Sequence, residues 1–287
     1  MATEIEVVKA SIFKYLAHLH DADYLGAIAT SMPLSEFYNI VSLLLQSEDN
    51  ETVGLTMLFI TDLVMASSRH PQCAEFGEQY LNSLVVKTLE QMVFSPNHYI
   101  CTQAVYTLGK TCSYASVDAI NQAFFKLRDI APLALPRLMG EMGWLGADNF
   151  WELLESMISS PVCATRWAVL DILHEFGGDR PTEEDALYQH KYKLVEKLRQ
   201  DSNMYVRLEA EYEYQLLKFR SESYELPKAE RRKQRKNLQL QYQPPYCFAG
   251  ISSKFLNTLN NMGRKEYSVS ELESFIDALF EQSLKPS

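Results

Sequence analysis

"SPVCATRWAVLDILHEFG", residues 160–177, shares its layout with other stretches of the chain. The closer copies are "SPNHYICTQAVYTLGKTC", residues 95–112, and "DSNMYVRLEAEYEYQLLK", residues 201–218, and a looser copy is "SEDNETVGLTMLFITDLV", residues 47–64. Each begins with a polar or proline-containing turn and continues as an amphipathic helix, because apolar residues recur every three or four positions. The three closer copies carry a small residue near the helix centre: Ala104, Ala168 and Ala210. A small side chain there lets a neighbouring helix pack closely.

This repeated pattern predicts an architecture. A short helix, a turn and a second helix with a small residue, recurring at about 40 residues, resemble the HEAT and armadillo class of helical repeats. The resemblance is best at the proline of the turn and at Val206, Arg207 and Ala210, and it extends over roughly residues 44–219. It implies an all-α fold, an α-solenoid of stacked helical hairpins, because one hairpin cannot bury both sides of its apolar face. A compact, irregular helical bundle is the alternative.

Helical periodicity continues through nearly the whole chain. No stretch keeps a strict two-residue alternation of apolar and polar residues between turns, so we expect almost no strand. Turn signals such as Pro33, Pro71 and the segment "GGDRPTEED", residues 177–185, separate the helices. We expect helices near residues 3–19, 22–30, 34–46, 50–67, 75–93, 97–112, 116–129, 131–142, 148–158, 161–176, 182–200, 203–219, 228–240, 251–261 and 268–282.

The composition is typical of a soluble globular protein, with 287 residues, of which 47% are hydrophobic and 22% charged. The most apolar stretch, residues 53–66, contains Asp62 and is too short to cross a bilayer. The first residues lack the basic start and apolar core of a signal peptide. Five scattered cysteines, none in a CxxC pair, argue against a disulfide framework and a structural zinc site. We therefore expect a cytoplasmic protein with no cofactor and no bound metal.

The charge is distributed unevenly. The net charge is −10, with ten basic and 21 acidic residues in residues 1–180 against 17 and 16 in residues 181–287. An acidic body argues against nucleic acid as a partner, because contact with many phosphates requires a continuous basic surface. The basic run "KAERRKQRK", residues 228–236, includes Glu230 among helix-forming neighbours. It is interpreted as a solvated helix face, with a local anion contact as the alternative.

Two stripes of residues are expected on the helix near 161–176. The core stripe comprises Val162, Thr165, Ala168 or Val169, Ile172, Leu173 and Phe176. Trp167, Asp171 and His174 share a second stripe, at i, i+4 and i+7, on the side away from that core. Either Trp167 packs against an adjoining loop or helix, or it lies on the concave surface of the repeats as an anchor for a partner, because tryptophan is enriched at binding hot spots.

A second resemblance concerns the same helix. "RWAVLD", residues 166–171, resembles the Trp-Ala-x-x-Asp helix of the HEAT-like DNA-alkylation glycosylases. That resemblance implies that Trp167, Asp171 and, in the following repeat, Arg207 face a lesion nucleotide. The carboxylate would stabilise an oxocarbenium-like centre while aromatic faces hold the departing cationic base. The HEAT-like lyases that attach bilin chromophores to antenna proteins share only the repeats with this chain.

The C-terminal part no longer follows the repeat layout. We expect residues 1–219 to form the HEAT-like repeat domain and residues 220–287 to form a helical cap, because a solenoid needs an end with a polar outer face. The turn "YQPPYCFAG", residues 242–250, is rich in aromatic residues and proline, and it could instead be an independent docking patch.

The leading functional hypothesis is a scaffold or adaptor that binds another protein in a concave helical groove and has no catalytic residues. Trp167 and nearby aromatic residues would anchor the partner, whereas an acidic rim would steer a basic or mixed-charge segment by complementary charge. The candidate partner-binding residues are Trp167, Asp171, His174, Arg207, Glu209 and Glu213. The glycosylase-like enzyme and the bilin-lyase-like protein remain as alternatives.

Overall fold

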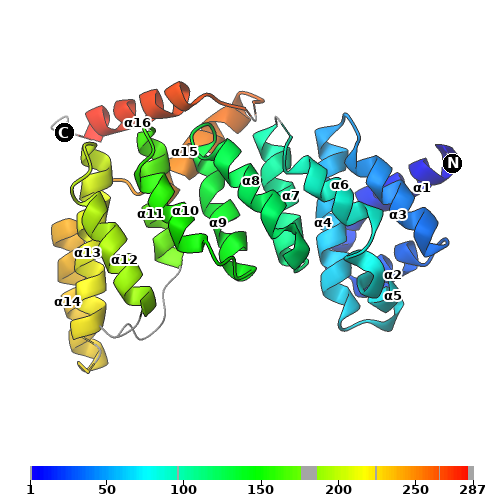
Figure 1. Ribbon diagram of the computed structural model, residues 1–287, viewed down its shortest axis with the longest axis horizontal. Coiled ribbons are helices and arrows are strands. Elements are labelled where there is room, and N and C mark those ends of the chain that lie inside the picture. The colour runs from blue at the N-terminus through cyan, green and yellow to red at the C-terminus, as the bar shows by residue number, and fades with distance from the viewer. Residues whose placement is uncertain (1, 96, 176–185, 224, 265, 284–287) are drawn as a thin grey trace. The chain divides into compact units, whose positions relative to one another are not determined.

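A computed structural model describes residues 2–95, 97–175, 186–223, 225–264 and 266–283. In these residues it contains sixteen α-helices, three short 3-10 helices and no strand (Figure 1). The predicted all-α class is therefore confirmed. The chain divides into two compact units, unit 1 with residues 1–124 and 141–147, and unit 2 with residues 125–140 and 148–287.

Unit 1 is built on two helical hairpins. Its helices are α1 (Ala2–Tyr15), α2 (Ala22–Ala29), α3 (Leu34–Leu45), α4 (Asn50–Ser67), α5 (Pro71–Tyr80), α6 (Leu84–Met92) and α7 (His98–Lys110). Both α8 (Val117–Leu127) and α9 (Leu135–Trp144) have residues in each unit. Two of the 3-10 helices, Leu16–His18 and Tyr114–Ser116, lie in unit 1, and the third, Pro132–Ala134, lies in unit 2. The hairpin α3/α4 packs on the hairpin α6/α7, so that α3 contacts α6 and α4 contacts α7.

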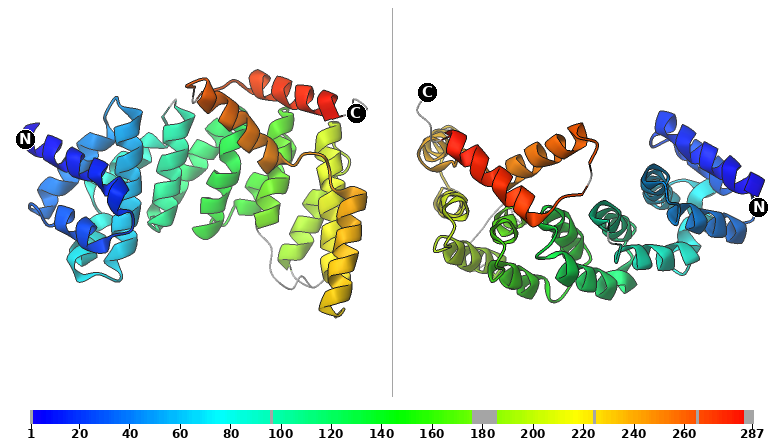
Figure 2. Two further views of the ribbon diagram at one scale, coloured as in Figure 1. Left: turned by 180° about the vertical axis from the view of Figure 1, so that it is seen from behind. Right: turned by 90° about the horizontal axis from the view of Figure 1, so that it is seen from above.

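Unit 2 repeats this arrangement and extends it. Its helices are α10 (Phe150–Ile158), α11 (Cys163–Glu175), α12 (Ala186–Leu198), α13 (Met204–Glu222), α14 (Lys228–Tyr242), α15 (Phe248–Asn261) and α16 (Val269–Ser283). The hairpins α10/α11 and α12/α13 pack with α10 on α12 and α11 on α13. Helix α14 lies along α13, whereas α15 and α16 contact each other and α11 (Figure 2). Residues from α11 and α13 are thus brought next to the C-terminal helices.

The repeated stretches form the helices that the pattern predicts, namely α4, α7, α11 and α13. The central alanines Ala104, Ala168 and Ala210 are fully buried, as close helix packing requires. The side chains of Asn97 and Asn203 cap α7 and α13 by accepting hydrogen bonds from backbone N–H groups of the first turn.

Three local expectations differ from the structure. The helix predicted near 75–93 is two helices, α5 and α6, because the chain turns at Asn82 and Ser83, whose backbone N–H groups donate to the carbonyls three residues back instead of four. The helix predicted near 131–142 opens with a 3-10 turn at Pro132. In the predicted core stripe of α11, Val162 is only partly buried. Phe176 and the predicted turn at 177–185 lie outside the described residues.

Helix α4, which contains the apolar stretch of residues 53–66, packs inside unit 1, where Phe59, Ile60 and Leu63 are fully buried. In the described part of the chain, no single helix is both long and apolar enough to cross a membrane. Two helix pairs meet the length and composition criteria only when taken together, and they are bent by 104° (α2 with α3) and 111° (α4 with α5).

The close approach of α4 and α5 gives a first testable prediction. A Cβ atom added at Gly77 would overlap the Cβ and Oγ atoms of Ser67 across the helix crossing. Replacing Gly77 by alanine therefore forces the two helices apart, and overpacking of this kind costs about 1 to 3 kcal/mol. We expect the free energy of unfolding to fall although alanine is the better helix former, as measured by urea denaturation followed by far-UV circular dichroism.

Gly140, within α9, is the matched control. A Cβ atom added there meets no other atom within 4 Å. The change Gly140→Ala is therefore expected to stabilise the protein by about 0.5 to 1 kcal/mol, through helix propensity alone. Equal effects of the two substitutions would show that α4 and α5 do not meet at Gly77.

Candidate functional site

Trp167, the first of the predicted site residues, is fully buried in unit 2. Its ring packs against Tyr205, Phe248 and Phe280, with ring centroids 6.0 to 6.1 Å apart. The alternative in which Trp167 packs against adjoining elements is therefore correct. The expectation that it lies away from the core as an exposed anchor is wrong, because α15 and α16 cover this side of α11.

The indole N–H of Trp167 donates a hydrogen bond to Oε2 of Glu209, on α13. The same oxygen accepts the backbone N–H of Phe248, the first residue of α15, at 2.9 Å. Glu209 is only 6% exposed, and burial raises its pKa to about 8 against the lowering effect of these two hydrogen bonds. One buried carboxyl group thus links α11, α13 and the start of α15.

On its other side, Glu209 lines a cavity of about 520 Å³, hereafter the acidic cavity. Four carboxylate residues line it, from α11 and α13: Asp171, Glu175, Glu209 and Glu213. His174, Lys254 and Tyr212 complete its charged and aromatic lining together with the segment 243–250, which leads from α14 into α15 (Figure 2). Every residue of this lining belongs to unit 2.

The carboxylates of the acidic cavity are short of positive charge. Burial raises the pKa of Asp171, and the neighbouring Glu175 and Glu213 raise it further, whereas His174 lowers it. The Nδ1 atom of His174 lies 3.3 Å from Oε1 of Glu213, and this hydrogen bond raises the pKa of His174. A raised pKa in a carboxyl group means that its ionised form is poorly compensated. The lining thus has four carboxylate residues against two basic ones, His174 and Lys254.

One part of the wall of the acidic cavity, from the segment before α15, is apolar and aromatic. Pro244, Pro245 and Tyr246 line it, and the Nζ atom of Lys254 lies 4.4 Å from the ring centroid of Tyr246. This contact is a cation–π interaction. The wall thus already holds one ammonium group of this chain against an aromatic face.

Arg207, the remaining predicted site residue, does not line the acidic cavity. Its guanidinium group donates to the backbone carbonyls of Asp201 and Ser202, at 2.6 and 2.8 Å. Arg166 makes the same bridge at the start of α11, to the carbonyls of Ser160 and Pro161. In both cases the arginine reaches back six and five positions and closes the turn before its helix. These contacts do not test its predicted role in partner binding, which stays a prediction.

Four of the six predicted residues, Asp171, His174, Glu209 and Glu213, therefore line one cavity. Sequence reasoning missed Glu175 and Lys254. It assigned the turn at 242–250 to the C-terminal cap, with an independent docking patch as the alternative, and had no means of placing it in one cavity with Asp171. The aromatic and proline content of that turn was the signal.

Comparison of the chain with models of protein families, with curated proteins and with solved structures found no match. Among the described residues, no group of three or more histidine, cysteine, aspartate or glutamate side chains is arranged to hold a metal ion.

Proposed function

We propose that this chain is a non-catalytic adaptor with HEAT-like repeats, and that its acidic cavity binds a lysine- or arginine-bearing segment of another protein. The observation that carries the proposal is the lining of the acidic cavity, in which the buried or partly buried Asp171, Glu209 and Glu213 face an aromatic wall. The proposal includes the solenoid arrangement, with residues 1–219 as its repeat domain and residues 220–287 as its cap.

The packing within each unit supports the repeat part of this proposal. In both units, the first helices of consecutive hairpins contact each other and so do the second helices, which is the nearest-neighbour packing of helical repeats. The identical bridges made by Arg166 and Arg207 add a repeated side-chain feature to the repeated helices.

Charge and shape support the partner class. A guest cation would favour the ionised forms of Asp171 and Glu209, whose pKa values burial raises, because opposite charge nearby favours the ionised form of a carboxyl group. Its alkyl stem would lie along Pro244, Pro245 and the Tyr246 ring, as long basic side chains do on apolar surfaces. A volume of about 520 Å³ is in the range of ordinary ligand pockets.

The glycosylase-like alternative is not carried into the proposal. It requires Trp167, Asp171 and Arg207 to face one nucleotide. Asp171 lines the acidic cavity, but Trp167 is enclosed by aromatic neighbours and Arg207 is bound to the carbonyls of its own turn. An acidic lining also repels phosphates, which a nucleic-acid substrate would bring close.

Neutralising the acidic cavity is expected to abolish partner binding. In the double variant Asp171→Asn and Glu213→Gln, the lining keeps its size but loses two negative charges that would pair with the guest. The test is affinity capture from source-cell lysate with chemical cross-linking, followed by mapping of the cross-linked segments. We expect a protein held by the wild type through a lysine- or arginine-bearing segment to be at least about tenfold depleted by the variant, since buried charge pairs are worth several kcal/mol.

The control variant, Glu196→Gln with Glu225→Gln, removes two exposed carboxylates of unit 2 that lie outside the cavity. It changes the net charge equally and is expected to capture the same proteins as the wild type. Identical capture by all three proteins, with far-UV circular dichroism unchanged, would refute the proposed role of the acidic cavity.

A further inference from the structure

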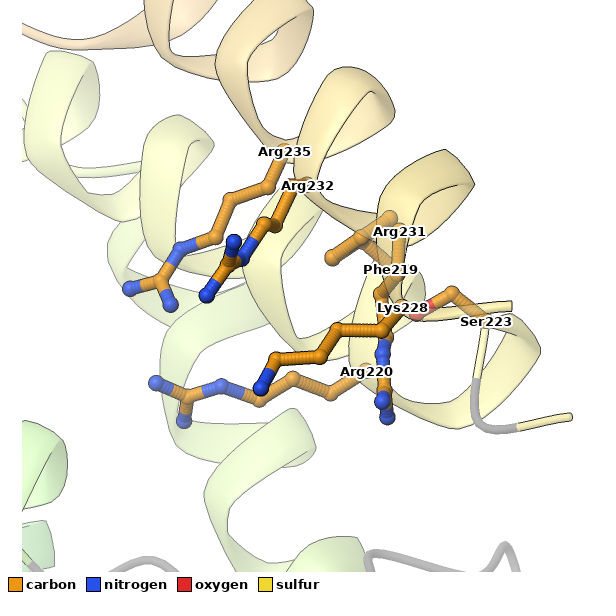
Figure 3. Close-up of a pocket in the computed structure, with 7 residues that line it drawn as sticks. All are labelled: Phe219, Arg220, Ser223, Lys228, Arg231, Arg232 and Arg235. Atoms are coloured by element: carbon orange, nitrogen blue, oxygen red, sulfur yellow. The ribbon is translucent and has the colours of Figure 1, made fainter. Parts of the chain in front are cut away.

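A second cleft in unit 2 has the opposite charge. Four basic residues of α14 recur at i, i+3, i+4 and i+7, which places them on one face of the helix: Lys228, Arg231, Arg232 and Arg235. This face meets the last turn of α13, where Arg220 joins them. Together with Phe219 and Ser223 they line a cleft of about 320 Å³, hereafter the cationic cleft (Figure 3). The charged ends of Arg220, Lys228, Arg232 and Arg235 project toward the same side.

Among the residues that the structure describes, the lining of the cationic cleft contains no carboxylate. Across the described residues, none of its five cations forms a salt bridge. The nearest acidic residues along these helices have other contacts, Glu222 with Lys218 and Glu230 with Gln234. Five like charges in one cleft repel one another. In a protein with 37 acidic residues and a net charge of −10, such a cluster is a local positive field that attracts anions.

The residue types indicate which anion fits. Arginine presents a planar fork of donors that matches phosphate oxygens in pairs, whereas lysine acts as a point charge, and the cationic cleft holds four of the former and one of the latter. One phosphate group carries at most two negative charges near neutral pH, so one group leaves most of this charge unbalanced. We propose that the cationic cleft is a binding site for a multiply phosphorylated anion.

This site is separate from the acidic cavity and does not depend on the proposed function. Glu209 and Glu213 line the acidic cavity from the first half of α13, whereas Arg220 lines the cationic cleft from its last turn. The basic run of residues 228–236 is a solvated helix, since none of its residues is buried, and one face of it forms this cleft. The alternative considered from the sequence, a local anion contact in this basic run, thus corresponds to the residues that line the cationic cleft.

The experiment is isothermal titration of the full chain with inorganic tripolyphosphate at low salt and at about 0.15 M salt. The double variant Arg231→Gln and Arg232→Gln is expected to bind at least about tenfold more weakly, because each charge-assisted hydrogen bond lost weakens binding by about that factor. The matched control is Lys233→Gln with Lys236→Gln, which removes two charges from α14 outside the cleft. It is expected to bind within about twofold of the wild type.

Citrate, a carboxylate anion of similar charge, is expected to bind much more weakly than tripolyphosphate. Equal losses in both double variants, equal binding of citrate, or no binding by the wild type would each overturn the proposal. Far-UV circular dichroism checks that both variants keep their helices.

Sedimentation with vesicles distinguishes the two sources of such an anion. Vesicles that carry a doubly phosphorylated inositol headgroup are compared with phosphatidylserine vesicles of equal charge. Selective binding of the former, lost in the Arg231 and Arg232 variant, would assign the cleft to a lipid headgroup. Binding of tripolyphosphate without vesicle binding would assign it to a soluble anion.

Discussion

Replacement of Trp167 by alanine is expected to lower the free energy of unfolding by about 3 to 5 kcal/mol. The indole fills the space between α11, α15 and α16, and its removal leaves a cavity lined by Tyr205, Phe248 and Phe280. It also removes one of the two donors to the buried carboxyl group of Glu209. Urea denaturation followed by far-UV circular dichroism measures the change.

Trp144 provides the matched control, because it is 76% exposed and its ring lies 5.6 Å from the ammonium group of Lys110. The change Trp144→Ala is expected to cost less than about 1 kcal/mol. If the two substitutions lower the free energy of unfolding equally, Trp167 is not part of the core. The alternative, in which Trp167 is an exposed anchor for a partner, would then be favoured.

A phenylalanine at position 167 separates packing from hydrogen bonding. It keeps most of the ring contacts but leaves Glu209 with the Phe248 N–H as its donor. We expect the Trp167→Phe variant to have a free energy of unfolding about 1 to 3 kcal/mol below that of the wild type, because a buried hydrogen bond that loses one partner usually costs this much.

The helices could be predicted from sequence because their signals are local. Apolar spacing and residues such as Asn97 and Asn203 act within one or two turns of the chain. The break between α5 and α6 was missed because Asn82 and Ser83 are weak turn signals beside the strong apolar pattern of the flanking helices. How the hairpins pack depends on contacts that no local pattern encodes.

The candidate site was predictable only in part for the same reason. Helical spacing placed Asp171 and His174 on one face of α11, and both line the acidic cavity. Spacing could not show that Trp167 is buried, because Phe248 and Phe280 come from helices far along the chain. The role of Arg207 was within reach, since Arg166 stands at the same place after an equivalent turn.

The two clefts place opposite charges along a single helix. On α13, Glu209 and Glu213 precede Arg220, which lies in the last turn. This order agrees with the helix dipole, whose C-terminal end favours cations. The charge of Arg220 also affects a buried group. Burial lowers the pKa of Lys191, and the positive charge of Arg220 lowers it further, to about 8.

The change Glu209→Gln is expected to remove most of the pH dependence of stability between about pH 5 and pH 8. Glu209 has a folded pKa of about 8 against an ordinary value of 4.5, so over this window the folded state binds the proton and the unfolded state does not. Stability therefore falls as the pH rises. A shift of this size corresponds to at most about 5 kcal/mol. Glutamine stays neutral and keeps a carbonyl oxygen that can accept the N–H groups of Trp167 and Phe248.

Other titratable groups near Glu209 also contribute to the pH dependence of stability. The raised pKa of Asp171 and the raised pKa of His174 both make stability fall with rising pH, so the Glu209→Gln variant retains a smaller slope. The pKa of Lys191 is lowered to about 8, so its contribution makes stability rise with pH only above that value. Denaturation in urea at several pH values from 5 to 8 therefore isolates the carboxyl groups and His174.

Glu211 is the control on the same helix. Burial raises its pKa, but hydrogen bonds from Gln215 and Arg199 outweigh burial and lower it below its usual range. Its titration therefore lies below the measured window, and Glu211→Gln is expected to leave the slope unchanged. A wild-type slope that survives in the Glu209→Gln variant would mean that Glu209 is already ionised in the folded protein. The acidic cavity would then carry one more negative charge at neutral pH, and a basic partner would bind it the more tightly.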